Sequence, residues 1–263
     1  MSSSSFRSAV SFLAFAYRNY AVSKNEFYAI FETLFWPVVN LFTIGLFASF
    51  LSLSSDEVSF VLIGIIVLSV VHIVQIDVAY VLLLDMWSMS LEYVIVTPLP
   101  FYRMVLSAWI FGVVRGSISF ALLAALSAEF FGFTLKLSAL PLALFLLGVY
   151  LGALLIGIVN CILILIFGRR AEIFAWTLTA IVMIFCGIYY PVSILPEPFR
   201  SVGLAIPLTH FLEYFRSFYG FPTTGSVLLG FAEVVVYLIL LLAVAEFSMK
   251  RARKTGLVLK LSG

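Results

Sequence analysis

Charged residues are scarce in this chain, where Asp, Glu, Lys and Arg together make up 11% of 263 residues. Soluble domains carry about 25% charged residues. Hydrophobic residues reach 63%, and a fold of this length cannot bury that much apolar surface away from water. The composition therefore excludes a soluble globular protein. Because the apolar residues come in long runs, it predicts an all-α integral membrane protein.

Residues that carry chemistry or bind metals are equally few. The two His, His72 and His210, cannot form a histidine metal site, and Cys161 and Cys186 stand in apolar runs without C-x-x-C spacing. The sequence has no GxxxxGK[ST] phosphate loop, no HExxH and no GxSxG. We therefore expect neither an enzyme nor a cofactor in this chain, and the net charge of +2 gives no reason to expect nucleic acid as a partner.

Six apolar runs are long enough to cross a bilayer, which takes about 20 residues in a helix. They are Leu34–Leu53, Phe60–Leu84, Met104–Phe131, Leu140–Phe167, Ile173–Ile194 and Val227–Phe247. Before them, residues 1–24 place aromatic and aliphatic side chains on one helical face and basic side chains largely elsewhere. This pattern is typical of a helix in the membrane interface, and the alternative is the start of the first span. We expect one domain over residues 1–263.

The distribution of basic residues predicts the orientation of these spans. If both termini lie inside, all but four of the 15 Lys and Arg fall in cytoplasmic segments. The four others are Lys136, Arg200 and Arg216 outside and Arg115 within a span. An excess of Lys and Arg on the cytoplasmic side is the general rule for membrane proteins. The sequence thus predicts a multi-pass protein of the cell membrane with both termini in the cytoplasm.

The connection between the second and third spans, Asp85–Arg103, has the composition of a short amphipathic helix. We predict a helix over residues 86–96, which hold apolar side chains and a carboxylate. Pro98 and Pro100 follow, and proline lacks an amide hydrogen and clashes with the preceding turn, so the helix is expected to stop near Val96. A helix of this kind on the cytoplasmic side needs a partner outside the membrane.

The connection between the fifth and sixth spans is too apolar for a free loop and too rich in Pro and Gly for a span. Residues 195–224 are predicted to form two short helices, Glu197–Ala205 and Leu208–Tyr219, which dip into the outer leaflet. Backbone at that depth must be covered by protein or line a cavity. We interpret this external re-entrant helical hairpin as a cap or gate.

Ionisable residues inside spans usually face the interior of a helix bundle. We hypothesise an ion pair between Asp77 and Arg115, with either a structural role or a role in substrate passage. Glu233, in the last span, is a candidate for a group exposed to a cavity. Four further polar residues are expected to form hydrogen bonds between helices. They are Asn40, His72, Gln75 and Asn160.

Two stretches resemble the permease subunits of type-2 ABC transporters. One is LEYVIVTPLPFYRMVLS, and the other is GIYYPVSILPEPFRSVGLAIPLTHFLEYFRSFYGF. The positions that match the second family signature are Gly187, Pro191, Ser193, Leu195, Pro196, Arg200, Pro207, Leu208, Thr209, Glu213 and Arg216. The chain departs from the family pattern at Met89-Ser90, where Gly-Thr is usual, and at Ile206, where Asn is usual. The six-span layout is similar too, so the resemblance extends over the whole chain.

The resemblance implies a half-transporter. Two copies of the chain would form the pathway, and two separate ATPase subunits, which bind ATP and Mg, would power it. Residues 86–96 would then be the coupling helix seated on the ATPase. The expected ATPase contacts are Met86, Trp87, Met89, Leu91, Glu92 and Tyr93, together with Arg169 and Arg170. The expected pathway or gate residues are Asp77, Arg115, Glu233, Pro207, Glu213 and Arg216.

The cargo and the source of energy remain open at this stage. The family moves amphipathic drugs, lipids or lipid-linked glycans, and we expect export of a drug, a lipid or another amphipathic molecule, with a polysaccharide or lipid-linked glycan as the alternative. An ion-coupled secondary transporter is a second hypothesis, but the sequence shows no internal repeat to support it. A third is a membrane scaffold that partners an ATPase without transport. Membrane lipid is a partner in every case.

Overall fold

The computed structural model describes residues 17–18, 27–90, 100–133 and 135–255, and these residues form helices and turns without a strand. The α-helices are α2 (Phe27–Phe50), α3 (Ser55–Trp87), α5 (Phe101–Phe131), α6 (Ala139–Phe167), α7 (Glu172–Phe185), α8 (Phe199–Leu204), α9 (Pro207–Ser217) and α10 (Val227–Thr255). Two short 3₁₀ turns, η1 (Gly168–Ala171) and η2 (Val192–Ile194), flank α7. The predicted all-α fold is confirmed for this part of the chain.

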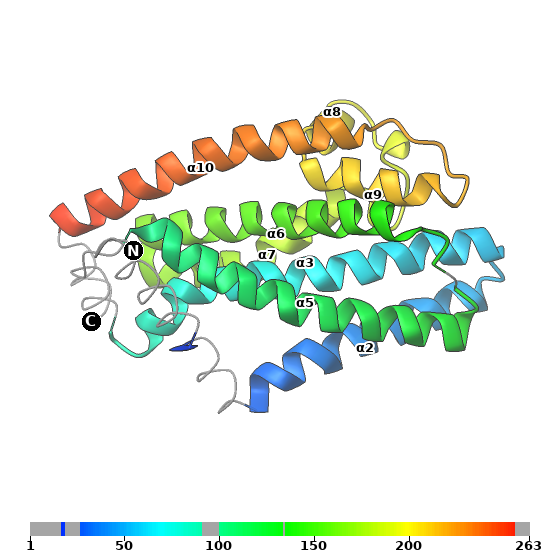
Figure 1. The fold of residues 1–263 in the computed structure, drawn as a ribbon, viewed down its shortest axis with the longest axis horizontal. Helices are drawn as coiled ribbons and strands as arrows, with labels where there is room; N and C mark the ends of the chain where they lie inside the picture. The colour runs from blue at the N-terminus through cyan, green and yellow to red at the C-terminus, as the bar shows by residue number, and fades with distance from the viewer. Residues whose placement is uncertain (1–16, 19–26, 91–99, 134, 256–263) are drawn as a thin grey trace, which may run out of the picture.

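Helix α3 lies at the centre of the bundle. It packs against α2, α5, α6, α7 and α9, while α10 packs on α6 and α9 at the far side (Figure 1). Small residues allow the closest approaches. A Cβ atom added at Gly112 of α5 would lie 3.2 Å from the Val74 Cα of α3, and one at Gly157 of α6 would lie 2.6 Å from the Val78 Cβ. The centre of the bundle therefore depends on glycine to bring α5 and α6 against α3.

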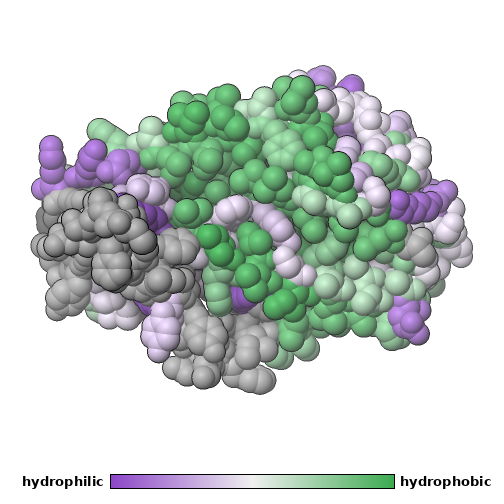
Figure 2. Space-filling view, in the orientation of Figure 1, coloured by the Kyte–Doolittle hydropathy of each residue, from purple (hydrophilic) through white to green (hydrophobic). Residues whose placement is uncertain are grey.

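Four helices are long and apolar enough to cross a membrane: Ser55–Trp87, Phe101–Phe131, Ala139–Phe167 and Val227–Ala252. Hydrophobic residues cover the middle of the face in Figure 2, and hydrophilic residues gather at its two ends. The other two expected spans lie in shorter apolar stretches, Leu34–Phe50 and Glu172–Phe185. The six-span count is therefore confirmed only to the extent of four crossing helices.

The two ends of the bundle differ in what they carry. Helices α8 and α9 lie at the end where α3 begins and α5 ends, as Figure 1 shows. The opposite end holds the last turn of α3, the first turn of α5, η1 and the last turns of α10. Basic residues found at this second end include Arg103, Arg170, Lys250 and Lys254. This is the end that the distribution of Lys and Arg assigns to the cytoplasm.

Helix ends follow local signals more closely than hydropathy does. Helix α3 begins five residues before the expected Phe60, because Ser54 and Glu57 form a capping box in which each side chain accepts the other's backbone N–H. Helix α7 stops at Phe185, nine residues before the expected Ile194. The chain turns at Gly187, which has φ +65°, and a Cβ there would lie 2.6 Å from Tyr190 O.

The expected helix over residues 86–96 also differs from the structure at its start. Met86 and Trp87 belong to the last turn of α3, so this helix does not begin at residue 86. Met89 adopts the left-handed conformation with φ +56°, and Ser90 donates its N–H to Asp85 O at 2.8 Å. The chain therefore turns away from α3 at residues 88–90. Residues 91–96 lie outside the described part of the chain, as does the expected interfacial helix except residues 17–18.

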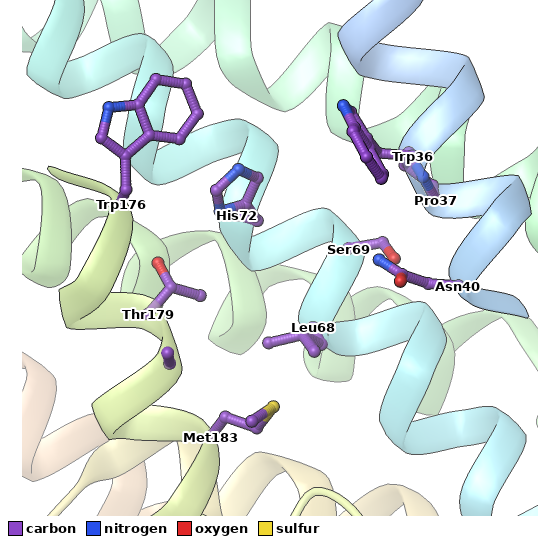
Figure 3. A pocket seen from close by; sticks show the side chains of 10 residues that line it. Trp36, Pro37, Asn40, Leu68, Ser69, His72, Trp176, Thr179 and Met183 are labelled. Carbon is purple, nitrogen blue, oxygen red and sulfur yellow. The ribbon is translucent and has the colours of Figure 1, made fainter. Parts of the chain in front are cut away.

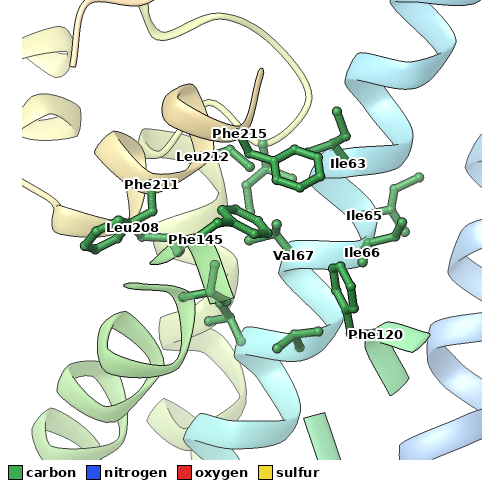
Figure 4. Packing of buried hydrophobic residues seen from close by; sticks show 14 of the residues in the cluster. Ile63, Ile65, Ile66, Val67, Phe120, Phe145, Leu208, Phe211, Leu212 and Phe215 are labelled. Carbon is green, nitrogen blue, oxygen red and sulfur yellow. The ribbon is translucent and has the colours of Figure 1, made fainter. Parts of the chain in front are cut away.

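The two short helices predicted before the last span are present as α8 and α9. Pro207 occupies the first turn of α9, where its missing N–H is not needed. One face of α9 carries large apolar side chains into the core, among them Leu208, Phe211 and Phe215 (Figure 4). They pack against Phe145 of α6 and Val67 of α3. This close packing against α6 and α3 holds α9 on the bundle.

Candidate functional site

A groove opens between α2, α3 and α7 and encloses a cavity of about 430 Å³ (Figure 3). Its described lining residues come from three helices: Trp36, Pro37 and Asn40 of α2, Leu68, Ser69 and His72 of α3, and Trp176, Thr179, Ala180 and Met183 of α7. Within each helix these residues are spaced three or four apart or adjacent, so they form one face. The groove thus collects polar and aromatic side chains in helices that are otherwise largely apolar.

A buried polar atom of this groove, the hydroxyl of Thr179, has no partner among the residues that the structure describes. The Thr179 hydroxyl is buried and makes no hydrogen bond within the described structure, and Figure 3 shows its oxygen on the side of the residue that faces Trp176. Buried polar atoms are nearly always paired, so an unpaired one invites a hydrogen bond from a ligand. Thr177, two residues earlier, instead donates to Ile173 O at 3.0 Å. Thr179 therefore lines the groove with a polar atom that has no partner among the described residues.

A buried network of amides holds the α7 wall of the groove in place. Gln75 of α3 donates to Ala175 O at 3.0 Å, and Asn160 of α6 donates to Gln75 Oε1 at 2.6 Å. Ala175 directly precedes Trp176, so this network fixes the position at which the indole enters the groove. The hydrogen bonds between helices expected for Gln75 and Asn160 are confirmed. His72 and Asn40 lie on the groove instead.

The ion pair expected between Asp77 and Arg115 is present between α3 and α5. Both side chains are buried, with 4% and 10% of their surface exposed. A Cβ at Gly112 would lie 3.3 Å from Asp77 Oδ2, so the glycine makes room for the carboxylate. Neither residue lines the groove. The pair lies in the interior of this bundle, on the side of α3 that faces α5.

The expected gate residues Arg216 and Glu213 of α9 form hydrogen bonds to backbone groups of neighbouring segments. The Arg216 guanidinium donates to Gly187 O and Ile188 O, both at 2.6 Å, and lies 3.5 Å from the centre of the Phe60 ring. Burial lowers the pKa of Arg216 and the charge of Glu213 opposes this, but a guanidinium stays protonated at neutral pH. Arg216 therefore joins α9 to the turn that ends α7.

Glu213 and His210 hold the connection from α9 to α10. Glu213 accepts the backbone N–H groups of Thr224 and Gly225 at 2.9 and 2.6 Å. His210 Nδ1 accepts from Ser226 N at 3.3 Å, which makes Nδ1 unprotonated and leaves the proton on Nε2. Nε2 faces Leu204 O at 3.0 Å and Glu233 Oε2 at 3.5 Å. Glu233, near the start of α10, thus faces His210 of α9 and does not line the groove.

The expected ATPase-contact residues lie at the other end of the bundle. Trp87 and Met89 are exposed, Met86 is buried, and Arg170 is exposed in η1. The rest of that set lies outside the described residues: Leu91, Glu92, Tyr93 and the side chain of Arg169.

At this end of the bundle, Asp85 of α3 contacts both Arg18 and Ser90. Its carboxylate accepts from Arg18 at 3.1 Å and from the Ser90 hydroxyl at 3.2 Å, so residues 17–18 are joined to the turn that leaves α3. Met86 and Trp87 therefore lead directly into a turn that an ion pair holds in shape.

Sequence reasoning missed the groove itself. Trp176, Thr179 and Met183 read as ordinary members of an apolar run, and Trp36 reads as part of another. Their spacing of three or four residues places them on one helical face, but it does not reveal which helices face one another. Only the packing of α2 and α7 on either side of α3 brings these side chains together.

No protein-family model matches the chain. It is similar to an uncharacterized protein of Archaeoglobus fulgidus, with 63% identity over 46 residues. These residues make up 18% of this chain and 72% of the relative. The relative's description assigns no activity, so the comparison establishes kinship and adds nothing about function.

Proposed function

We propose a function for this chain from its own residues, because it belongs to the family of the Archaeoglobus fulgidus protein, whose description assigns no activity. The chain is the transmembrane subunit of an ATP-driven exporter. Two copies form the pathway, and two separate ATPase subunits supply the energy. The proposal rests on the likeness of its two signature stretches to type-2 ABC permeases and on one structural observation, the groove between α2, α3 and α7.

The groove carries this proposal because of where its polar side chains lie. Asn40, Ser69, His72 and Thr179 belong to helices or apolar stretches that are suited to the membrane interior. Polar groups at that depth are tolerated where they face protein or line a water-accessible cavity. A groove that is open along one side offers half of such a cavity. A second copy that placed its own groove opposite would complete a pathway.

The proposed source of energy is a separate ATPase, because the sequence has no phosphate-binding loop with which to bind ATP itself. We place the contact at the end of the bundle where α3 gives way to residues 88–103, which the distribution of Lys and Arg predicts to be cytoplasmic. Trp87 and Met89 offer exposed apolar surface there. The Arg18–Asp85 ion pair stiffens the same turn, so a displacement of this turn by the ATPase would be transmitted to α3. Helix α3 carries Leu68, Ser69 and His72 of the groove.

Two alternatives each have an observation in their favour. The two indoles in the groove can pack against a sugar ring as well as an aromatic one, and this observation favours the alternative of a polysaccharide or lipid-linked glycan exporter. The buried Asp77–Arg115 ion pair is the kind of intramembrane charge that ion-coupled transporters use. We prefer ATP-driven export of a drug, lipid or other amphipathic molecule because the signature stretches support it and because the ion pair lies away from the groove.

The proposal is tested by purifying the chain from its own membranes, identifying any copurifying subunit that carries a Walker motif, and reconstituting both proteins in vesicles. We expect the two proteins to copurify and ATP to drive the movement of amphipathic dyes. Glu92→Arg with Trp87→Ala should preserve the folded protein but lower ATP-driven transport by at least tenfold. Glu129→Arg, an exposed carboxylate at the opposite end, is the matched control. Absence of both copurification and ATP-dependent transport would refute the proposal.

A further inference from the structure

The groove has an unusual lining, with two indoles and no Asp, Glu, Lys or Arg among its ten described residues. We infer that it binds an uncharged ring that carries a hydrogen-bonding group, with the ring against Trp176 and Trp36 and the polar group at Thr179. Only one part of the inference rests on the proposed function, namely that the ring belongs to the exported molecule. The binding itself needs no ATPase.

The two indoles lie on opposite walls of the groove. Trp36 comes from α2 and Trp176 from α7, with 54% and 37% of their surface exposed (Figure 3). His72 of α3 lies between them, and its ring centre is 6.0 Å from that of Trp176. Indole faces stack on aromatic rings, and they also pack against the C–H face of a sugar ring. A ring between the walls would gain contact from both sides.

The polar part of the ligand is set by Thr179. Its hydroxyl is the buried and unpaired group described above, and the residue is only 3% exposed. A hydrogen bond to such a group removes the cost of leaving it unpaired, so it favours ligands that carry a hydroxyl or an amide. Ser69 of α3 lies beside Asn40 of α2, and together they offer a second polar position (Figure 3).

The same lining disfavours charged ligands. A charge that leaves water needs an opposite charge or several hydrogen bonds to offset the lost hydration. The ten described residues offer neither Asp, Glu, Lys nor Arg. His72 is the one titratable residue among them, and with an ordinary pKa of about 6.5 a histidine is uncharged at pH 8. The cavity of about 430 Å³ has the volume of small-ligand sites, and it accommodates a ring system of two or three rings.

The test uses the four Trp of the chain as separate reporters. The full-length protein is labelled with 5-fluorotryptophan in lipid nanodiscs at pH 8, and each ¹⁹F resonance is assigned by a Trp→Phe variant. The probes are 2-naphthol, 2-methylnaphthalene, naphthalene-2-sulfonate, 2-naphthylmethylammonium and hexyl glucoside. We expect 2-naphthol to shift the Trp36 and Trp176 resonances. Trp109, whose Nε1 donates to Tyr150 O at 2.8 Å away from the groove, should stay unchanged.

The charged probes should bind about tenfold more weakly than 2-naphthol. Hexyl glucoside separates the two kinds of ring. Shifts caused by 2-naphthol alone identify an aromatic ring, and shifts caused by the glucoside identify a sugar. The inference is overturned if no neutral probe shifts both groove resonances, if Trp109 shifts equally, or if a charged probe binds as tightly as 2-naphthol.

A variant of the hydroxyl tests the position of the polar group. Thr179→Val keeps the shape of the side chain, and it should weaken 2-naphthol about fivefold while leaving 2-methylnaphthalene, which has no hydroxyl, unchanged. Thr177→Val on the exposed side of α7 is the matched control and should change neither. Equal weakening of both probes would overturn the role of Thr179. If the probes bind as expected but ATP drives no transport, the proposed function fails and the ring site stands.

Discussion

Single residues in this protein hold helices together through backbone carbonyl groups. Arg216 is the main example, because its guanidinium reaches Gly187 O, Ile188 O and Phe60 O from α9. The carbonyl groups at the turn after α7 lack an intrahelical partner, and a buried carbonyl without one is costly. A residue that the sequence signature marks as a gate candidate thus makes contacts that explain a structural requirement at that position.

We expect Arg216→Leu to lower the free energy of unfolding by about 3 kcal/mol, because it leaves two or three buried carbonyl groups unpaired. The measurement is equilibrium unfolding in mixed micelles of dodecyl maltoside and SDS. Arg200→Leu in α8, whose side chain is partly exposed, is the control and should change the value by less than about 0.5 kcal/mol. A similar loss in both variants would contradict the anchoring role of Arg216.

The Asp77–Arg115 ion pair allows a structural role to be separated from a role in transport. Arg115→Gln alone leaves a buried carboxylate without its charge partner and should destabilise the protein by about 3–5 kcal/mol. The double variant Asp77→Asn/Arg115→Gln removes both charges, so it should regain most of that loss. Unfolding is measured as above, and transport is measured on the same samples. Wild-type transport in a stable double variant assigns the pair a structural role, and lost transport assigns it a part in passage.

At the scale of helices, the sequence predicted which stretches form helices better than where they end. The apolar runs predicted α3, α5, α6 and α10 correctly, because a long apolar run indicates a segment that is buried or surrounded by lipid. The stop of α7 at Phe185 depends on Gly187 and its close approach to Tyr190 O, which is a tertiary contact. The groove was beyond sequence reasoning for the same reason. It depends on which helices pack side by side, and single-helix patterns do not contain that information.

Close packing between α3 and the turn after α7 gives a prediction at this scale. A Cβ at Gly64 would lie 1.9 Å from the backbone oxygen of Ile188, so Gly64→Ala forces the turn away from α3. We expect a loss of about 2–3 kcal/mol in unfolding free energy. Gly152→Ala in α6 is the matched control, since its Cβ would meet Leu208 Cδ1 at an ordinary 3.6 Å. It should be neutral or stabilising by about 0.5–1 kcal/mol.

The two glycine variants also separate packing from helix propensity. Both place alanine in a helix interior, so any gain in propensity is shared. A stable Gly64→Ala variant would show that α3 and the turn at Ile188 lie further apart than the structure has them.

At the scale of the whole molecule, two sides of the bundle differ in the side chains that they expose. Helix α10 lies on one side against α6 and α9, and its outer residues are large and apolar, as expected for contact with lipid. Helices α2 and α7 flank the groove on another side, and there polar side chains interrupt the apolar surface. Lipid is a poor neighbour for the exposed amide of Asn40, and a second protein surface is a better one.

This difference predicts which face the proposed dimer would use. A cysteine at Ala180, which is exposed on the groove, should form a disulfide between two copies in membranes, since a second copy would lie opposite. A cysteine at Ile239, which is 64% exposed on α10, should not. The native Cys161 and Cys186 are both free and fully buried, so they do not compete. The measurement is the fraction of covalent dimer after mild oxidation. Dimer from Ile239→Cys but not from Ala180→Cys would place the interface on α10, leave the groove facing lipid, and remove the central support for a pathway built from two grooves.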